Sequence, residues 1–128
     1  MRANPGSMTA ILLVDNDPLE ASMMLSLLGR RFGNVHRATD AAEALCLIEQ
    51  PDFASKLGLV ISGDHMPGFG GPAFVAELHS RMPDLPVLVL GSAGEAPADY
   101  SEAHAAFLAK PFSTESVLAL TGQMLAEH

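Results

Sequence analysis

The segment LVISGDHMPGFGG, from Leu59 to Gly71, is the part of the sequence that indicates the fold most clearly. It continues an apolar run that begins at Leu57, and the run from Leu57 to Ser62 predicts a strand. The apolar residues are continuous rather than alternating, which is typical of a strand buried on both faces of a sheet. The Met-Pro-Gly that follows predicts a loop. A buried strand of this kind indicates a parallel sheet that helices cover on both sides.

Four more short apolar runs lie along the chain, and helical patterns separate them. A unit of strand and helix repeated five times predicts right-handed crossovers and a doubly wound α/β domain of three layers. The second strand is weakly apolar, which places it near an edge of the sheet. The expected strands are Ala10 to Val14, Asn34 to Ala38, Pro86 to Leu90 and Ala106 to Ala109.

The expected helices begin at residues that cap helices well. Asp17 followed by Pro18 starts a helix that runs to about Phe32. Thr39 or Asp40 caps a helix through Ile48, others span Pro72 to Arg81 and about Asp99 to Ala105, and Ser113 caps the last. We expect one apolar face on each of two helices, together with core packing by Met23 and Met24. The face of the first helix comprises Leu19, Met23, Leu27 and Leu28, and that of the last comprises Val117, Leu118 and Leu125.

Composition limits the classes of function. The 128 residues suffice for one domain, and Met1 to Ser7 (MRANPGS) is expected to be an expression scar, which leaves 8–127 as the domain. The net charge of −8 with seven basic residues provides no basic face, so we expect no binding to nucleic acid or to anionic membranes. Cys46 is the single cysteine, which we expect to be buried and which fits a reducing cytoplasm.

Polar residues follow the ends of the predicted strands. The carboxyl ends of parallel strands share one edge of the sheet, and ligands bind there in doubly wound folds. The residues expected at this edge are Asp15, Asn16, Asp17, Gly63, Asp64, Gly91, Ser92 and Lys110.

These segments resemble the receiver domains of two-component response regulators. The resemblance covers residues 8–127 and rests on ILLVDNDP, LVISGDHMPGFGG, LPVLVLGSA and FLAKPF, which start at Ile11, Leu59, Leu85 and Phe107. It implies a flavodoxin-like fold with strand order 2-1-3-4-5 and a role in bacterial phosphorelay signal transduction. It also implies a pocket in which an aspartate accepts a phosphoryl group beside Mg²⁺.

Three of the five pocket positions depart from the pattern of the family. Asp15 matches the first metal-binding acid, but Asn16 replaces the second. Gly63 stands where the phosphoacceptor aspartate is expected, and Gly91 replaces a Thr or Ser. Glycine has no atom that could take a phosphoryl group.

Lys110 is retained, and Phe107 matches an aromatic residue that often acts as a rotameric switch. The family's pocket has three carboxylates and one ammonium, whereas the matching positions here have one of each. Asp15 and Lys110 can therefore neutralise each other without a metal, and we expect no cofactor and at most weak Mg²⁺ binding at Asp15 and Asn16.

We therefore expect a degenerate receiver domain that is not an enzyme and that binds proteins in the cytoplasm. The resemblance implies that a histidine kinase, an effector domain or a second copy would dock on the helix around 99–105, the fifth strand and the last helix. The alternative is a working phosphoacceptor at Asp64, displaced by one residue, with Ser92 as the displaced hydroxyl. A one-residue step turns a side chain to the opposite side of an extended segment, which argues against this alternative.

Two further interpretations have less support. A small-ligand binder or enzyme on the same fold would need a Gly-rich phosphate loop or a nucleophile with its base, and neither is visible. Metal binding by Asp17 is less economical than its role as a helix cap. His65, His79 and His104 show no metal-ligand spacing, so we expect them to be surface residues.

Overall fold

The computed structural model describes residues 9–63, 71–91, 105–109 and 113–127. Within these residues five strands form one parallel sheet in the order β2-β1-β3-β4-β5, as predicted. The strands are β1 (Ala10–Val14), β2 (Val35–Ala38), β3 (Leu57–Gly63), β4 (Val87–Gly91) and β5 (Ala105–Ala109). The helices are α2 (Pro18–Phe32), α3 (Ala41–Ile48), α4 (Pro51–Lys56), α5 (Gly71–Arg81) and α6 (Thr114–Glu127).

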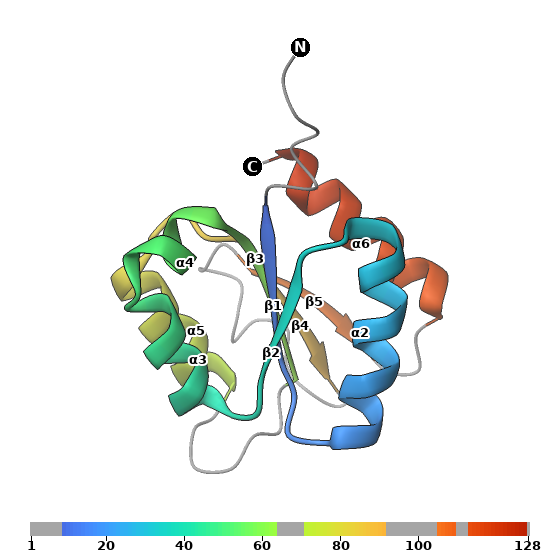
Figure 1. Cartoon of the computed structure of the whole chain (residues 1–128), viewed down its shortest axis with the longest axis horizontal. Helices are drawn as coiled ribbons and strands as arrows, with labels where there is room; N and C mark the ends of the chain where they lie inside the picture. The colour runs from blue at the N-terminus through green and yellow to red at the C-terminus, as the bar shows by residue number, and fades with distance from the viewer. Residues whose placement is uncertain (1–8, 64–70, 92–104, 110–112, 128) are drawn as a thin grey trace.

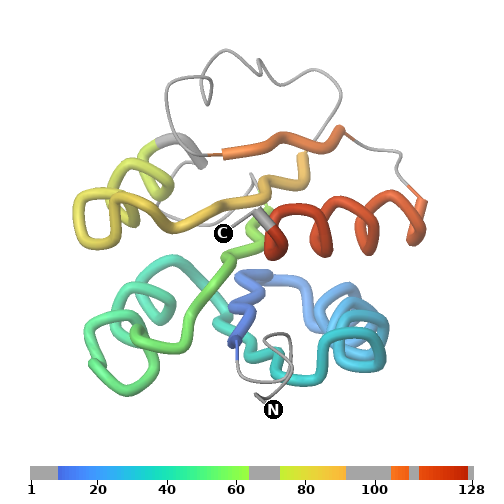
Figure 2. The backbone as a smooth tube through the Cα atoms, turned by 90° about the horizontal axis from the view of Figure 1, so that it is seen from above, coloured from blue at the N-terminus to red at the C-terminus, as the bar shows by residue number. Residues whose placement is uncertain are grey.

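Helices cover both faces of the sheet, which gives three layers (Figure 1). α2 and α6 lie on one face, and α3, α4 and α5 lie on the other, as the view from above also shows (Figure 2). Successive residues of a strand point to opposite faces, so each strand contributes to two cores. In β1, Ile11 and Leu13 join the core beneath α2 and α6, whereas Leu12 and Val14 join the other. This arrangement confirms the doubly wound, flavodoxin-like fold.

Side-chain caps set the starts of three helices, as predicted. Asp17 accepts hydrogen bonds from the amides of Leu19 and Glu20, and Pro18 is the first residue of α2. Asp40, and not Thr39, caps α3. At α6 the hydroxyl of Ser113 accepts from the amide of Ser116 at 3.1 Å. Each cap satisfies amide groups that the first turn of a helix leaves unpaired.

The predicted buried face of α2 was partly wrong. Leu19 is 72% exposed and Met23 is 59% exposed. The residues of α2 that reach the core are Ala21, Met24 and Leu28, which share one helical stripe. Leu19 and Met23 precede members of that stripe by one or two residues, and a step of one residue turns a helix by about 100°. Apolar character alone therefore misplaced the stripe.

The prediction that Cys46 is buried was also wrong, because its side chain is exposed. The buried residues of α3 are Ala41, Ala44 and Ile48, which pack on the sheet. Cys46 is two residues after Ala44, and two residues turn the helix by about 200°, so it points away from the sheet.

The ends of several elements differ from the prediction. α4 was not predicted, although Pro51 suits the first turn of a helix. Ala105 is the first residue of β5, whereas we expected it in a helix that otherwise lies outside the described residues. Among the residues that the structure describes, no helix is both long and apolar enough to cross a membrane.

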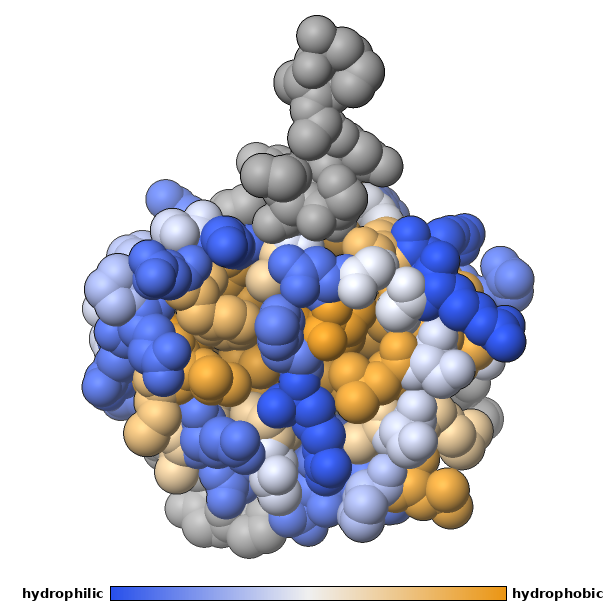
Figure 3. Space-filling model, in the orientation of Figure 1, coloured by the Kyte–Doolittle hydropathy of each residue, from blue (hydrophilic) through white to orange (hydrophobic). Residues whose placement is uncertain are grey.

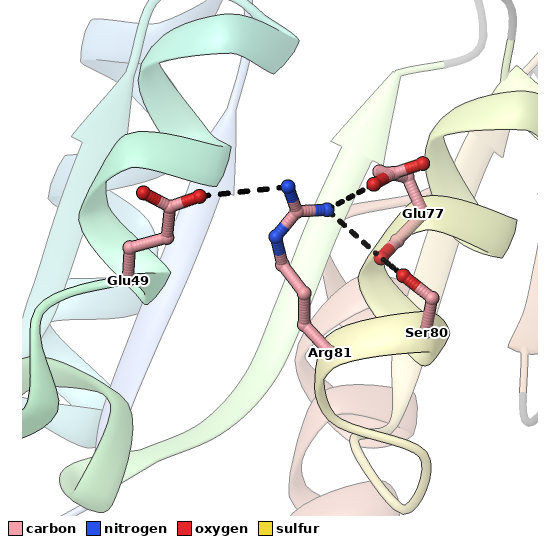
Figure 4. A network of polar contacts seen from close by, with 4 residues as sticks. All are labelled: Glu49, Glu77, Ser80 and Arg81. Atoms are coloured by element: carbon pink, nitrogen blue, oxygen red, sulfur yellow. Dashed lines mark hydrogen bonds and ion pairs between the residues drawn. The ribbon is translucent and has the colours of Figure 1, made fainter.

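An ionic network joins α3 to α5 at the edge of the sheet where the strands begin (Figure 4). The guanidinium of Arg81 lies 3.5 Å from the carboxylate of Glu49, just after α3, and pairs with Glu77 one turn earlier in α5. The hydrogen bond to Glu77 raises the pKa of Arg81 above its ordinary value, so the guanidinium stays charged. The three groups are partly exposed, so the network adds little stability. It lies at the opposite edge from the candidate site.

Candidate functional site

The candidate site lies where β1, β3 and β4 end. These strands are neighbours, and their register pairs Val14 with Ser62 and Gly63 with Leu90. Their carboxyl ends therefore reach the same edge of the sheet, which is the lower edge in Figure 1. Asp15 follows β1 directly, Gly63 is the last residue of β3, and Gly91 is the last residue of β4.

The loop after β1 is held by its own hydrogen bonds. The half-buried carboxylate of Asp15 accepts from the amide of Asp17 at 2.9 Å, and Asp17 in turn caps α2. Asn16, between them, is exposed. Both acids therefore have structural roles that require no metal ion, and the predicted capping role of Asp17 is confirmed.

Arg37 adds a cation to this loop, which the sequence analysis did not foresee. It lies on β2, and its guanidinium donates two hydrogen bonds to the backbone carbonyl of Asp15, at 2.8 Å and 3.2 Å. β2 pairs with β1, so the register brings Arg37 beside Leu13 and within reach of the loop. A basic residue near the end of a neighbouring parallel strand was the signal that could have identified it.

Gly63 is a glycine that the backbone does not require. Among the described residues the only glycine with positive φ is Gly33, so Gly63 has a conformation that other residues adopt. A Cβ atom added at Gly63 meets nothing within 4 Å, as far as the described part of the chain shows. Within the described residues, therefore, neither strain nor crowding explains why this position has no side chain.

Ser62 and Phe107 flank the site in β3 and β5. The buried hydroxyl of Ser62 donates to the carbonyl of Gly63 at 2.9 Å, a contact that the sequence analysis missed. Phe107 is half-buried and packs against the core beneath α3 and α5, and its role as a switch stays a prediction.

His79 does not belong to this site. It lies on α5, and its Nε2 is 2.7 Å from the carbonyl oxygen of Leu85.

Five of the candidate site residues and histidines fall outside the described part of the chain. They are Asp64, His65, Ser92, His104 and Lys110. The pairing of Asp15 with Lys110 and the displaced site at Asp64 and Ser92 therefore stay predictions.

The described residues at this edge do not fit a divalent metal ion. Mg²⁺ prefers several oxygen ligands, usually carboxylates. Asp15 supplies one carboxylate, Asn16 supplies an amide, and Gly63 supplies no side chain. The described ranges hold no cluster of three or more acidic, histidine or cysteine side chains suited to a metal.

The chain belongs to the response regulator receiver domain family, whose model matches residues 11–121. It is 32% identical to the sensor kinase CckA of Brucella abortus (strain 2308) over 96% of this chain and 13% of that protein. It is 30% identical to the C4-dicarboxylate transport transcriptional regulatory protein DctD of Pseudomonas aeruginosa over 86% of this chain and 24% of that protein. The chain thus spans less than a quarter of the length of either relative.

Solved structures agree with this assignment. The signal receiver domain of an HD domain-containing protein from Pseudomonas fluorescens Pf-5 superposes with a TM-score of 0.80 at 27% identity, covering 93% of this chain and 95% of that one. A response regulator receiver domain protein from Clostridium thermocellum reaches a TM-score of 0.84 at 20% identity, with 93% and 95% covered, which shows the shared fold alone.

Proposed function

We propose that this receiver domain has lost phosphorylation on aspartate and acts as a non-enzymatic protein-interaction module in bacterial two-component signal transduction. The family assignment supports the signalling role. Gly63 supports the loss of the phosphoryl acceptor, because the residue at the end of β3 has no nucleophilic atom. We place its action in the cytoplasm, where two-component relays receive their phosphoryl groups.

The single observation that carries the proposal is the open space at Gly63. A glycine held by strain or crowding would be a structural necessity, and the acceptor could then have moved elsewhere in a rebuilt pocket. Position 63 has neither restraint among the described residues. The described backbone leaves space for a side chain there, so the glycine supports a loss of chemistry better than a steric demand of the fold.

The neighbouring groups support the same conclusion. Phosphoryl transfer to an aspartate depends on positioning and on neutralising charge with a metal. Asp15 is the one carboxylate retained at the matching positions, and its Oδ1 accepts the amide of Asp17. Arg37 holds the carbonyl of the same residue. One carboxylate is a poor ligand set for Mg²⁺, so metal binding would be weak.

The partners would be proteins. One relative is a sensor kinase and another is a transcriptional regulatory protein, so a kinase or an effector domain is a reasonable class of partner. A module that takes no phosphoryl group would be switched by partner binding, because a ligand shifts a conformational equilibrium only through its different affinity for the two states.

Intact-mass measurement tests this proposal. The protein is incubated with acetyl phosphate and Mg²⁺, and Asp64→Ala is treated in parallel. We expect the mass of both proteins to stay unchanged. A gain of about 80 Da in the unmodified chain that is absent from Asp64→Ala would contradict the proposal, because it would place a working acceptor at Asp64.

A further inference from the structure

The exposed side of α2 combines apolar and charged residues in one stripe. We define the α2 stripe as Leu19, Glu20, Met23, Leu27, Arg30 and Arg31. Among the described residues, Leu19 and Met23 are the large apolar side chains that are exposed. They occupy the corner of the molecule where α2 begins, and Figure 3 shows apolar surface there.

A groove runs beside this stripe between α2 and α6. It has a volume of about 190 Å³, and apolar side chains of both helices form most of its lining. Met23 and Leu27 line it from α2, and Val117 and Leu118 line it from α6. An exposed apolar surface with charged ends is typical of a protein-binding site.

The charges along α2 are arranged so that the stripe complements itself. Glu20 lies in the first turn, whereas Arg30 and Arg31 lie in the last turn. Arg31 is eleven positions after Glu20, which corresponds to about 16 Å along the helix. Two copies of α2 placed antiparallel about a two-fold axis near Ser26 would bring Glu20 of each level with Arg31 of the other. Met23 of one copy would then lie between Leu27 and Arg30 of the second.

The charge of the whole chain also favours this face. The chain carries −8 overall, which opposes contact between most of its surfaces. α2 has one acidic and two basic residues, and its exposed cap Asp17 adds a second acid, so this region is close to neutral. A neutral surface opposes contact between two copies less than the acidic remainder of the chain does.

We propose that the α2 stripe is a self-association surface, through which two copies of this chain form a two-fold antiparallel dimer. The stripe lies on α2, whereas the family resemblance places docking on 99–105, β5 and α6. The two surfaces adjoin at α6, which lines one side of the groove. The proposal does not depend on whether the domain accepts a phosphoryl group. A contact built on one helix and its neighbour is small, so the dimer is weak and depends on concentration.

Sedimentation velocity over a concentration series up to about 1 mM tests the dimer, because weak pairs assemble in this range. We expect the average mass to rise toward that of a dimer. Met23→Asp should return it to that of a monomer, and it should leave folding unchanged because Met23 is exposed. Lys56→Asp, an exposed change on α4, should not affect association.

Charge reversal tests the antiparallel geometry. Glu20→Arg and Arg31→Glu should each weaken the dimer at least tenfold, and the double variant Glu20→Arg/Arg31→Glu should restore most of the affinity. These charges also favour the helix dipole, so the double variant should have the lowest Tm of the set. If the double variant associates although it has the lowest Tm, the loss of association in the single variants comes from broken charge pairs and not from weaker folding.

Three results would overturn the proposal. One is a monomer at every concentration, which would mean that the α2 stripe does not bind a second copy of this chain. Another is a dimer that Met23→Asp does not weaken, which would place the contact on another face. The third is a double charge reversal that associates no better than the single variants, which would exclude the antiparallel pairing.

Discussion

Glycine at position 63 removes a charge as well as a nucleophile from the edge of the sheet. The loop after β1 already holds Asp15 and Asp17 close together. A further carboxylate at the end of β3 would repel them unless a cation lay between. The proposed loss of the acceptor and the proposed weak binding of Mg²⁺ would thus be one electrostatic change, and restoring one without the other would be unfavourable.

Restoring two carboxylates should make the protein respond to Mg²⁺. We expect Asn16→Asp/Gly63→Asp to have a lower Tm than the unmodified chain without Mg²⁺, because like charges repel. Mg²⁺ at a free concentration of ten times the Kd of the new site would stabilise the variant by about 1.4 kcal/mol. This would raise its Tm by about 5 °C. Differential scanning fluorimetry with and without Mg²⁺ measures both effects.

The matched control is Gln50→Asp/Ser55→Asp, which adds the same charge at exposed positions in or beside α4. Its Tm should not respond to Mg²⁺, and neither should that of the unmodified chain. A rise of several degrees in the unmodified chain would show that the present residues already bind the ion.

The side chain of Thr121 places a hydroxyl group in the interior of the domain. It is fully buried in α6, and within the described residues its hydroxyl has no hydrogen-bond partner. A buried hydroxyl without a partner costs free energy, whereas a methyl group of similar size does not. We expect Thr121→Val to raise the free energy of unfolding by about 1 kcal/mol in urea denaturation.

Thr121→Ser separates this effect from packing. It keeps the hydroxyl and removes a buried methyl group, so it should lower the free energy of unfolding by about 1 kcal/mol. Opposite signs for the two variants support an unpaired hydroxyl. Destabilisation by both would mean that the hydroxyl has a partner.

At the scale of elements, α2 depends on its cap. The carboxylate of Asp17 accepts two amide hydrogen bonds at the start of the helix. Asp17→Ala removes them and should lower the free energy of unfolding by about 1 kcal/mol, as measured in urea. Asp17→Asn keeps an acceptor and should cost much less. Equal losses in the two variants would indicate that the charge, and not the cap, matters.

The strands were predictable because each is a short apolar run between turn signals, and a strand buried on both faces needs no alternation. Leu12 and Leu13 face different cores, yet both are fully buried. The face of α2 was not predictable to the same degree. Leu19 and Met23 are as apolar as Met24 and Leu28, and the sheet alone decides which stripe it covers.

The site was predictable only where one residue acts alone. The placement of Asp15 and Gly63 at strand ends and the capping by Asp17 followed from local sequence. Arg37 could not be assigned in that way, because its contact with Asp15 depends on the register of β2 against β1. Register comes from the packed sheet and is not visible in a single segment.

At the scale of the whole molecule, the chain has the fold of its family. The five-stranded sheet, the two cores and the capped helices match those of a receiver domain. Fold does not determine function, so the proposed loss of phosphorylation rests on the residues at the strand ends. In that proposal, the domain presents its helices to protein partners without carrying a phosphoryl group.

The most direct test is a titration with beryllofluoride and Mg²⁺, followed by amide NMR. Beryllofluoride mimics a phosphoryl group when it binds an acceptor carboxylate beside the metal. We predict no saturable shift at the amides of Asp15, Asn16 and Gly63. Saturable shifts at these amides that require both ions, and that disappear in Asp64→Ala, would contradict the account.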